Sequence, residues 1–246
     1  MSDALPPPPP LSELAAAGPV ALFLDFDGTL VEIAATYDAI AVPEGLGRRL
    51  ERLSAAHGDR MALVSGRSLH DLDSHLGPVG VAMAGSHGAE RRRMDGGPLG
   101  DRPRGVPDDV RAALRAFADD NSGIRVEEKS FGAALHFRDV PELEQKADAR
   151  MDELAQDHDL AIKRGKAVIE LVAPGSTKGA AVEVFMAKDR FVGARPVFIG
   201  DDVTDEDGFA VVVAMGGIAI AVGERASAHA THHLADPTAV HQWLEL

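Results

Sequence analysis

Two aspartates separated by one residue follow a short apolar run near the start of the chain. Asp25 and Asp27 come directly after ValAlaLeuPheLeu at 20–24 and precede GlyThrLeu. Side chains alternate along a strand, so positions two apart leave it on the same side and reach one small volume. Two carboxylates about 4 Å apart repel by about 4 kcal/mol at an effective dielectric near 20, so we expect a divalent cation or a shared proton there. The pattern is typical of a reaction centre.

Phosphoryl transfer is the chemistry that this pair suits. The Asp25 carboxylate can attack phosphorus in line and form an aspartyl phosphate, provided that the charge of the phosphate is neutralised. Asp27 could protonate the departing oxygen and later take a proton from the attacking water, a role usually worth about 10² to 10⁴-fold. Gly28 lets the backbone approach the phosphate, so that neighbouring amides can donate to it. The alternative is an acidic turn chosen for its geometry.

Ser65 meets the same chemical demand at the end of a second apolar run, MetAlaLeuVal at 61–64. Its hydroxyl can donate to a phosphate oxygen, and Gly66 opens the turn after it. An ordinary strand-to-helix turn with Ser as N-cap is the alternative. Arg67 is open between a substrate contact and a structural ion pair.

Lys178 lies in the first turn of a predicted helix, after ProGlySerThr. The helix dipole disfavours a cation there, so an anion such as phosphate is expected nearby. A solvated lysine is the alternative. The segment lacks the spacing of a nucleotide P-loop.

A run of carboxylates, GlyAspAspValThrAspGluAsp at 200–207, follows a third apolar run. Asp201 is the best candidate to join Asp25 in holding Mg2+, which prefers oxygen ligands. Asp205, four residues later, could complete or orient the metal site, and Asp202 is expected to act in the same way. The alternative is a solvated acidic run at the start of a helix.

The elements that must position these residues are strands and helices in alternation. Apolar runs at 20–24, 61–64 and 81–84 alternate with helical patterns at 44–53 and 68–76, which is typical of parallel βαβ units whose loops at the carboxyl ends of the strands form the site. The run at 196–200 adds another strand end.

A different pattern occupies residues 102–174. Its order, αββαββ, predicts an α+β module inserted into the main sheet, with a helix at 108–119, strands at 124–129 and 132–138, a helix at 141–156, and strands at 160–164 and 167–173. We therefore expect a flexible proline-rich leader over 1–17, a core over 18–101 and 175–246, and an inserted module over 102–174.

Bulk composition limits the class of protein. The chain has 246 residues, a net charge of -14 and no cysteine, which excludes disulfides, thiolate metal sites and a cysteine nucleophile. The negative charge argues against nucleic-acid binding by counterion release, and no apolar run is long enough to span a membrane. The start of the chain lacks the pattern of a secretion signal. We expect a cytoplasmic monomer that binds a small molecule.

Taken in order, these motifs resemble those of the haloacid dehalogenase-like (HAD) superfamily: AspXAspGlyThr, then Ser, then Lys, then GlyAspAspXXXAsp. Further segments look like the trehalose-6-phosphate phosphatase family, namely AGSHGAE at 84–90, EEKSFGAALHFR at 127–138, GKAVIELVAPGSTKGAA at 165–181 and GDDVTDEDGF at 200–209. The resemblance covers nearly everything after the proline-rich start.

The resemblance implies an Mg2+-dependent phosphatase with a Rossmann-like α/β core and an inserted C2-type cap that closes over a sugar phosphate. It implies that Asp25 is the nucleophile, that Asp27 is the acid/base whose main-chain carbonyl also ligates the metal, and that Asp201 is a further ligand. Ser65 and Lys178 would bind the phosphate. The residues then expected on the substrate side are Gly28, Thr29, Gly66, Arg67, His87, Glu127, Lys129 and Glu170.

Alternation supports part of the cap assignment. Arg125, Glu127 and Lys129 share one polar strand face opposite Ile124 and Val126. A solvent-facing strand edge is the alternative reading of this face.

Three other functions remain open at this stage. The same chemistry could act on another sugar phosphate, such as sucrose phosphate or mannosyl-phosphoglycerate. A phosphomutase could return the phosphate from the intermediate to the sugar. A catalytically silent regulator could bind a phosphosugar without releasing phosphate.

Overall fold

The computed structural model describes residues 5–33, 40–101, 105–165, 167–188 and 190–246. The chain divides into two compact units, which are described separately: unit 1 comprises Met1–Arg102 with Thr177–Leu246, and unit 2 comprises Pro103–Ser176. The predicted inserted module, 102–174, begins one residue earlier and ends two residues earlier than unit 2.

Unit 1 is built on one mainly parallel sheet with the strand order β11-β10-β9-β1-β2-β3-β4. Among the described strands of this sheet, only the edge pair β3–β4 is antiparallel. The strands are β1 (Val20–Leu24), β2 (Met61–Val64), β3 (Ala82–Gly85), β4 (Glu90–Arg92), β9 (Arg195–Gly200), β10 (Ile218–Val222) and β11 (His232–Leu234). The central strands read as continuous apolar runs because helices cover both faces of the sheet.

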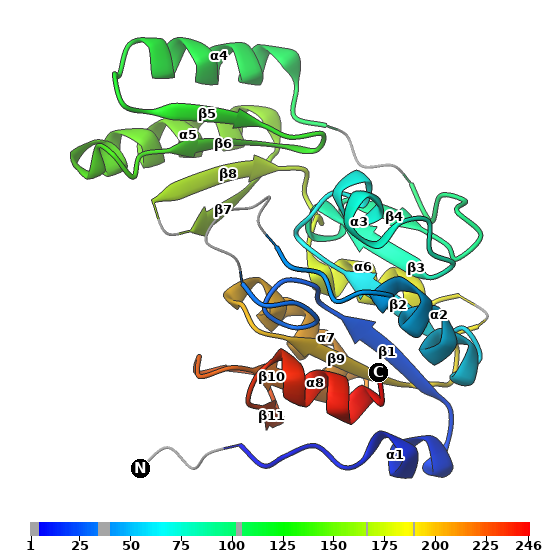
Figure 1. The fold of residues 1–246 in the computed structure, drawn as a ribbon. Coiled ribbons are helices and arrows are strands. Elements are labelled where there is room, and N and C mark those ends of the chain that lie inside the picture. The colour runs from blue at the N-terminus through cyan, green and yellow to red at the C-terminus, as the bar shows by residue number, and fades with distance from the viewer. Residues whose placement is uncertain (1–4, 34–39, 102–104, 166, 189) are drawn as a thin grey trace. The chain divides into compact units, whose positions relative to one another are not determined.

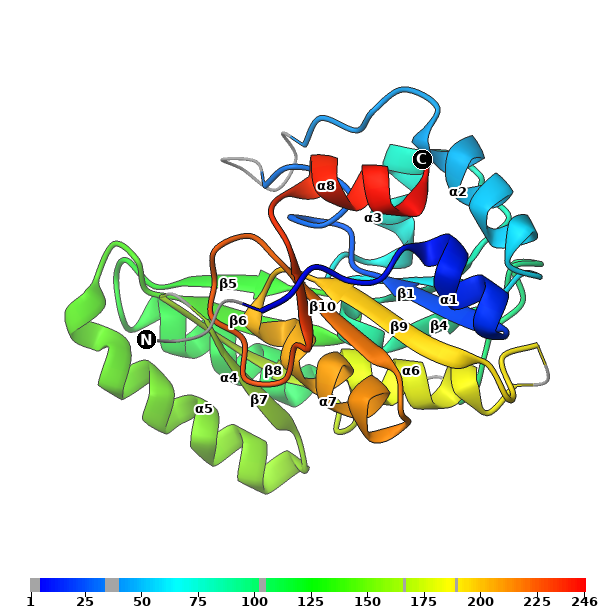
Figure 2. The same cartoon turned by 90° about the horizontal axis from the view of Figure 1, so that it is seen from below.

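The two faces of this sheet bury different sets of side chains. In β1, Leu22 and Leu24 join one apolar cluster and Phe23 joins the other, so all five of its residues are buried. The first cluster is covered by α1 (Leu11–Ala17), α2 (Leu46–Ala56), α3 (Leu69–Leu76) and α8 (Pro237–Leu244), and the second by α6 (Lys178–Met186) and α7 (Glu206–Ala214). Figure 2 shows α8 and α2 on one side of β1 and β9, with α6 and α7 on the other.

Three adjacent strands, β9, β1 and β2, carry predicted site residues at their carboxyl ends. Strand β1 lies between β9 and β2 (Figure 1), with Leu24 paired to Ile199 and to Leu63. Since these strands are parallel and in register, the residues that follow them emerge at one edge of the sheet. Short 3-10 turns follow β3 at Ser86–Gly88 and β9 at Val203–Asp205.

Residues 5–17 pack against the core instead of forming a separate flexible leader. The carbonyl of Pro6 accepts from the His233 amide at 3.0 Å, and the carbonyl of Pro9 accepts from the Trp243 indole at 2.8 Å. Leu11 and Leu14 of α1 are buried in the core. The expectation of a flexible leader over 1–17 is therefore corrected for the part that the structure describes.

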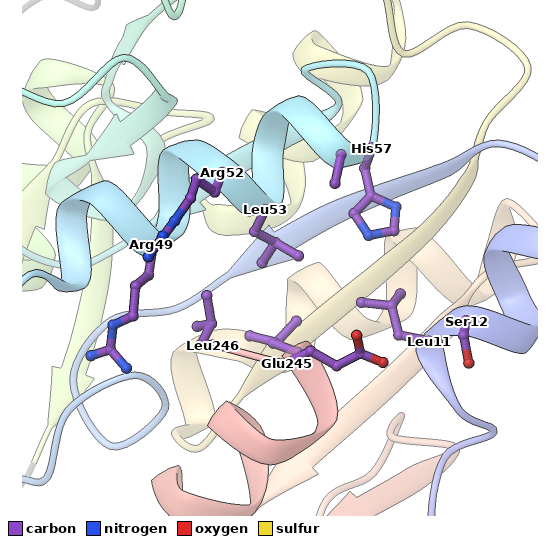
Figure 3. A pocket seen from close by; sticks show the side chains of 10 residues that line it. Leu11, Ser12, Arg49, Arg52, Leu53, His57, Glu245 and Leu246 are labelled. Carbon is purple, nitrogen blue, oxygen red and sulfur yellow. The ribbon is translucent and has the colours of Figure 1, made fainter.

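A surface hollow marks where α1 meets the rest of unit 1. Figure 3 shows Leu11 of α1 beside His57, which follows α2, and Glu245, which follows α8. His57 lies just before β2 begins, so this hollow is at the amino ends of the strands, opposite the edge that carries the candidate site. The hollow therefore lies away from the candidate site.

Unit 2 has an antiparallel sheet with the order β5-β6-β8-β7. Its elements are α4 (Asp108–Asp119), β5 (Arg125–Glu128), β6 (Gly132–His136), a 3-10 turn (Pro141–Leu143), α5 (Glu144–His158), β7 (Ala161–Gly165) and β8 (Val168–Val172). Both helices pack on one face, where Leu135 and Leu171 contribute to the buried cluster. The predicted order αββαββ is confirmed.

The opposite face of the unit 2 sheet carries polar side chains. Ala134 is paired with Glu127 on one side and Glu170 on the other, and Glu170 is paired with Lys163, so these four positions form one row. Across the described residues no helix is long and apolar enough to cross a bilayer. The α/β architecture with an inserted α+β unit agrees with the predicted fold class.

The packing of the first helix can be tested with two leucines. Leu14→Ala removes a buried side chain from the unit 1 core and should lower the free energy of unfolding by about 2 to 5 kcal/mol. Leu5, which is 36% exposed, is the matched control. Leu5→Ala should change the free energy of unfolding by less than about 0.5 kcal/mol. Urea unfolding measures both. Equal, small effects would contradict the packed arrangement.

Candidate active site

The site is organised around a buried lysine between two buried carboxylates. Lys178 Nζ lies 2.8 Å from Asp25 Oδ1 and 2.6 Å from Asp205 Oδ1. The three side chains are 3%, 6% and 0% exposed, respectively. A buried ammonium is tolerated only when it is paired in this way, so the contacts fix the position of the nucleophile candidate Asp25.

Local structure explains why each partner is where it is. The Asp25 amide donates to the Ile199 carbonyl at 2.9 Å, which continues the β1–β9 pairing by one residue. Lys178 is the first residue of α6, whose N-cap Thr177 accepts from the Ala180 amide at 3.1 Å. The anions that compensate this lysine at a helix N-terminus include the protein's own carboxylates.

Three carboxylates gather where a metal could bind. One oxygen each from Asp25, Asp201 and Asp205 lies within 4.8 Å of the other two. Three ionised carboxylates against the one ammonium of Lys178 leave two negative charges, which matches the charge of a divalent cation. An all-oxygen donor set suits a hard cation such as Mg2+ or Ca2+. The residues present therefore fit a divalent metal.

The electrostatics of this cluster follow from its burial. Burial raises the pKa of Asp25 and of Asp205, and Lys178 only partly opposes this. Burial and the neighbouring Asp205 raise the pKa of Asp201 to about 6. Burial disfavours the charged form of Lys178, but Asp205 and Asp25 outweigh it, so the lysine pKa is raised. Without a cation the cluster holds protons unusually tightly.

Asp205 is held by its own loop as well as by Lys178. The Asp202 amide donates to Asp205 Oδ2 at 2.9 Å, and the Asp205 amide donates to the Asp202 carbonyl at 3.0 Å. A Cβ at Gly200 would lie 2.3 Å from Asp205 Cγ, so only glycine leaves room for this carboxylate. Asp202 itself is exposed and is not one of the three clustered carboxylates.

Asp27 leaves the same strand end but does not join the three carboxylates. Its two oxygens accept from Arg67 Nε at 2.7 Å and from Arg67 Nη2 at 2.8 Å. Arg67 is 3% exposed. Of the two sequence readings of Arg67, the structure contains the ion pair.

Ser65 lies at the end of β2 and is fully buried. Its Oγ accepts from the Arg67 amide at 3.1 Å, which leaves the hydroxyl proton for an acceptor in the site. A Cβ at Gly66 would lie 2.7 Å from His87 Cε1, so this glycine admits the imidazole ring. His87 has φ +56°, and Ser86 before it has φ +50°. Consecutive left-handed residues of this kind store strain and cluster at functional sites.

Gly28 brings the turn after β1 against the loop that carries Asp201. Its φ is +73°, and an added Cβ would lie 2.1 Å from Asp201 Oδ2. Its own amide donates to the Val31 carbonyl at 2.7 Å. The adjacent Thr29 is fully buried, and its hydroxyl has no hydrogen-bond partner among the described residues. Close approach to Asp201 is therefore the physical reason for glycine at position 28.

The predicted cap residues come together within unit 2. Lys129 Nζ lies 3.3 Å from Glu170 Oε1, and a Cβ at Gly132 would lie 2.4 Å from that same oxygen. Glu127 lies in the same polar row and pairs with His136, with Oε2 and Nε2 separated by 2.8 Å. His136 is a partner that the sequence analysis did not assign.

Arg225 is a second residue that the sequence analysis missed. It follows β10, and its Nε donates to the Asp201 carbonyl at 3.1 Å and its Nη2 to the Asp202 carbonyl at 3.0 Å. Its Nη2 also lies 2.6 Å from Glu206 Oε1. No sequence motif announces this contact, because it joins a loop after one strand to the backbone of another.

Comparison with known proteins gives one family. Residues 23–238 match the model of the trehalose-phosphatase family. The chain is 37% identical over 228 residues to the trehalose-6-phosphate phosphatase of Escherichia coli (strain K12), and the match covers 92% of this chain and 85% of that protein.

Solved structures give the same result. A crystal structure described as a trehalose-6-phosphate phosphatase related protein has a TM-score of 0.70 at 27% identity, covering 92% of this chain and 95% of that one. A phosphatase of the HAD superfamily from Bacteroides thetaiotaomicron has a TM-score of 0.65 at 17% identity, covering 92% and 93%, which shows the shared fold. The resemblance inferred from the motifs is confirmed.

A substitution at Gly28 should disturb the candidate metal site. Gly28→Ala brings a Cβ onto Asp201 and should weaken Mg2+ binding by about tenfold or more, as expected when the support of a ligand is lost. The left-handed backbone should also cost about 1 to 2 kcal/mol of stability. Isothermal titration with Mg2+ and urea unfolding measure the two effects.

Gly45 provides the matched control for that substitution. Its φ is +71°, but nothing lies within 4 Å of an added Cβ. Gly45→Ala should therefore lose similar stability while keeping its affinity for Mg2+. The same loss of affinity in both variants would contradict the steric explanation.

Binding of Mg2+ should depend on pH through Asp201. The folded-state pKa of this carboxyl is about 6 and exceeds its ordinary value near 4, so the metal-free protein loses stability from this group as the pH rises across that interval. Above that pH interval the carboxylates are ionised, and binding of a cation to them is favoured. The increase in melting temperature caused by Mg2+ should be small at about pH 5 and large at about pH 7.5. An increase independent of pH would contradict a carboxylate site.

Proposed function

The chain belongs to the trehalose-phosphatase family, and from this premise we propose that it hydrolyses trehalose 6-phosphate to trehalose and phosphate, with Asp25 as nucleophile and Mg2+ as cofactor. One observation carries the mechanism: the Lys178 ammonium and the three carboxylates converge at the end of β1. This arrangement supports attack by a carboxylate on an anion, because positive charge is available beside it.

In the first step an oxygen of Asp25 attacks phosphorus and the bond to O6 of the sugar breaks. Lys178 fixes the attacking carboxylate through Oδ1 and reduces its repulsion from the phosphate. Ser65 donates its hydroxyl to a phosphate oxygen. Asp27 supplies the proton that the departing sugar oxygen requires. The products of this step are trehalose and phosphorylated Asp25.

In the second step water attacks the phosphorus of the aspartyl phosphate. Asp27 takes the proton from this water, and the bond from phosphorus to the Asp25 oxygen breaks. Inorganic phosphate leaves and the Asp25 carboxylate is restored. The same side chain thus serves as acid and then as base.

Asp25 and Asp201, with the main-chain carbonyl of Asp27, would hold Mg2+, and Asp205 would orient the site from its bond to Lys178. Bound there, the ion neutralises negative charge on the phosphoryl group and the carboxylates. Asp202 would orient the loop through its bond with Asp205.

We propose that unit 2 is the cap that recognises the sugar. Glu127, Lys129 and Glu170 offer two carboxylates and one ammonium on one sheet face, which suits a ligand with many hydroxyl groups. In the same proposal, the phosphate end of the substrate is bound beside His87, Gly66 and Thr29. The charge and hydrogen-bonding capacity of this face support a polar substrate.

A panel of phosphate esters tests the proposed function. Free phosphate is measured with trehalose 6-phosphate, sucrose phosphate, mannosyl-phosphoglycerate and glucose 6-phosphate, each with and without Mg2+. We expect the highest kcat/KM with trehalose 6-phosphate and loss of turnover without the metal. Equal turnover of glucose 6-phosphate would contradict disaccharide recognition, an isomerised sugar phosphate would indicate a mutase, and binding without release would indicate a regulator.

The cap residues should affect the sugar phosphate selectively. Glu170→Gln or Glu127→Gln removes a charged hydrogen-bond acceptor and should lower kcat/KM for trehalose 6-phosphate by about 10 to 100-fold, while 4-nitrophenyl phosphate is affected little. Steady-state kinetics with both substrates measure the difference.

Glu128 is the matched control on the same strand. Its side chain pairs with Arg111 and Arg115 on the helix side of the sheet. Glu128→Gln should leave the ratio of the two kcat/KM values unchanged. A loss shared equally by both substrates in Glu170→Gln would count against sugar recognition by this face.

A further inference from the structure

Arg67 is a buried cation at the proposed catalytic end of unit 1. It follows β2 by three residues, and it is 3% exposed. A buried guanidinium needs charged or polar partners, because its desolvation is costly. The identity of those partners defines what the residue does.

The principal partner is Asp27, through two parallel hydrogen bonds. Arg67 Nε donates to Oδ2 at 2.7 Å and Nη2 donates to Oδ1 at 2.8 Å. A bidentate pair of this kind fixes the plane and the direction of the carboxylate as well as its position. The third guanidinium nitrogen, Nη1, lies 3.5 Å from Nε2 of His75 on α3.

The main chain of Arg67 is held just as firmly. Its amide donates to Ser65 Oγ at 3.1 Å, and its carbonyl accepts from the Ser86 amide at 2.7 Å. A Cβ at Gly85 would lie 2.8 Å from that carbonyl oxygen, so β3 packs tightly against it. One residue therefore connects the predicted phosphate ligand Ser65 with the predicted acid/base Asp27.

The orientation of the Asp27 side chain depends on its contact with Arg67, because Asp27 is more exposed than Asp25. Its side chain is 35% exposed, whereas that of Asp25 is 6% exposed and paired with Lys178. One side of the Asp27 carboxylate is covered by Arg67 and the other is open. Without the fork, the carboxylate would be free to rotate away from the reacting oxygen.

We propose that Arg67 is a positioning residue, which orients Asp27 for proton transfer, and that it does not bind the phosphate. This inference rests on the proposed phosphatase function. Nε and Nη2 already donate to Asp27, and Nη1 lies 3.5 Å from His75 Nε2, so each nitrogen of the guanidinium has a partner within the protein. The cation beside Asp25 is Lys178.

Leaving-group dependence separates positioning from phosphate binding. An alkoxide needs a proton from Asp27 as it departs, whereas 4-nitrophenolate departs without one, and kcat/KM reports the steps up to that departure. In Arg67→Gln, kcat/KM for trehalose 6-phosphate should fall by about 100-fold, the loss expected for a misplaced catalytic group, with little change for 4-nitrophenyl phosphate. Arg67→Lys should keep only part of the wild-type kcat/KM for trehalose 6-phosphate, since a lysine cannot make the two parallel hydrogen bonds to Asp27.

A double-mutant cycle with Asp27→Asn gives a second readout. If Arg67 acts through Asp27, adding Arg67→Gln to Asp27→Asn should cause no further loss with trehalose 6-phosphate. Full additivity, or equal losses with both substrates from a raised KM, would overturn the inference and favour a phosphate contact.

Arg92 supplies the matched control, because it also pairs with a carboxylate through two hydrogen bonds: Nη1 donates to Asp73 Oδ2 at 2.7 Å and Nη2 to Asp73 Oδ1 at 2.5 Å. Arg92→Gln should lower stability without changing the ratio of kcat/KM for trehalose 6-phosphate to kcat/KM for 4-nitrophenyl phosphate.

If the wild-type chain does not hydrolyse trehalose 6-phosphate, the proposed function fails. The Arg67 comparison is then made with glucose 6-phosphate, whose leaving group is also an alkoxide. The two failures are therefore distinguishable.

Discussion

The whole site depends on one buried ammonium group. Lys178 enters the core at the first turn of α6 and contacts Asp25 and Asp205, which come from the ends of different strands. Burial disfavours every charge in this group, so each member is stable only with the others present. The same burial raises the pKa values of the carboxylates, and the three ionised carboxylates outnumber the ammonium by two negative charges, which a divalent cation can balance. Charge balance, more than any single contact, links the fold to the chemistry.

Much of the fold and the core of the site could be predicted from the sequence, because their causes are local. Continuous apolar runs predict buried parallel strands, and the carboxyl ends of such strands share one edge of a sheet. Asp25, Ser65 and Asp201 each follow such a run, and the structure has β1, β2 and β9 adjacent. In unit 2, alternation predicted the polar face that carries Glu127, whereas Glu170, which lies in the same row, was expected only from the family resemblance.

The remaining features depend on contacts between distant segments. Asp205 reaches Lys178 across 27 residues and Arg67 reaches Asp27 across 40, and no local pattern encodes either pairing. Gly28 was predicted to admit a phosphate, but its hydrogen atom faces Asp201, a residue from another strand. The proline-rich start has the composition of a flexible leader, yet its carbonyls accept from β11 and α8 at the other end of the chain. Composition describes what a segment can do alone, and tertiary contacts decide what it does here.

The central claim is that the carboxylate of Asp25 becomes phosphorylated beside a divalent cation. The most direct measurement is a crystal structure grown with Mg2+ and beryllium fluoride, which mimics an acyl phosphate. The account predicts density for the fluoride group bonded to an oxygen of Asp25, with a metal ion contacting Asp25 and Asp201. Density on another side chain, or an unmodified Asp25 despite saturating reagent, would contradict it.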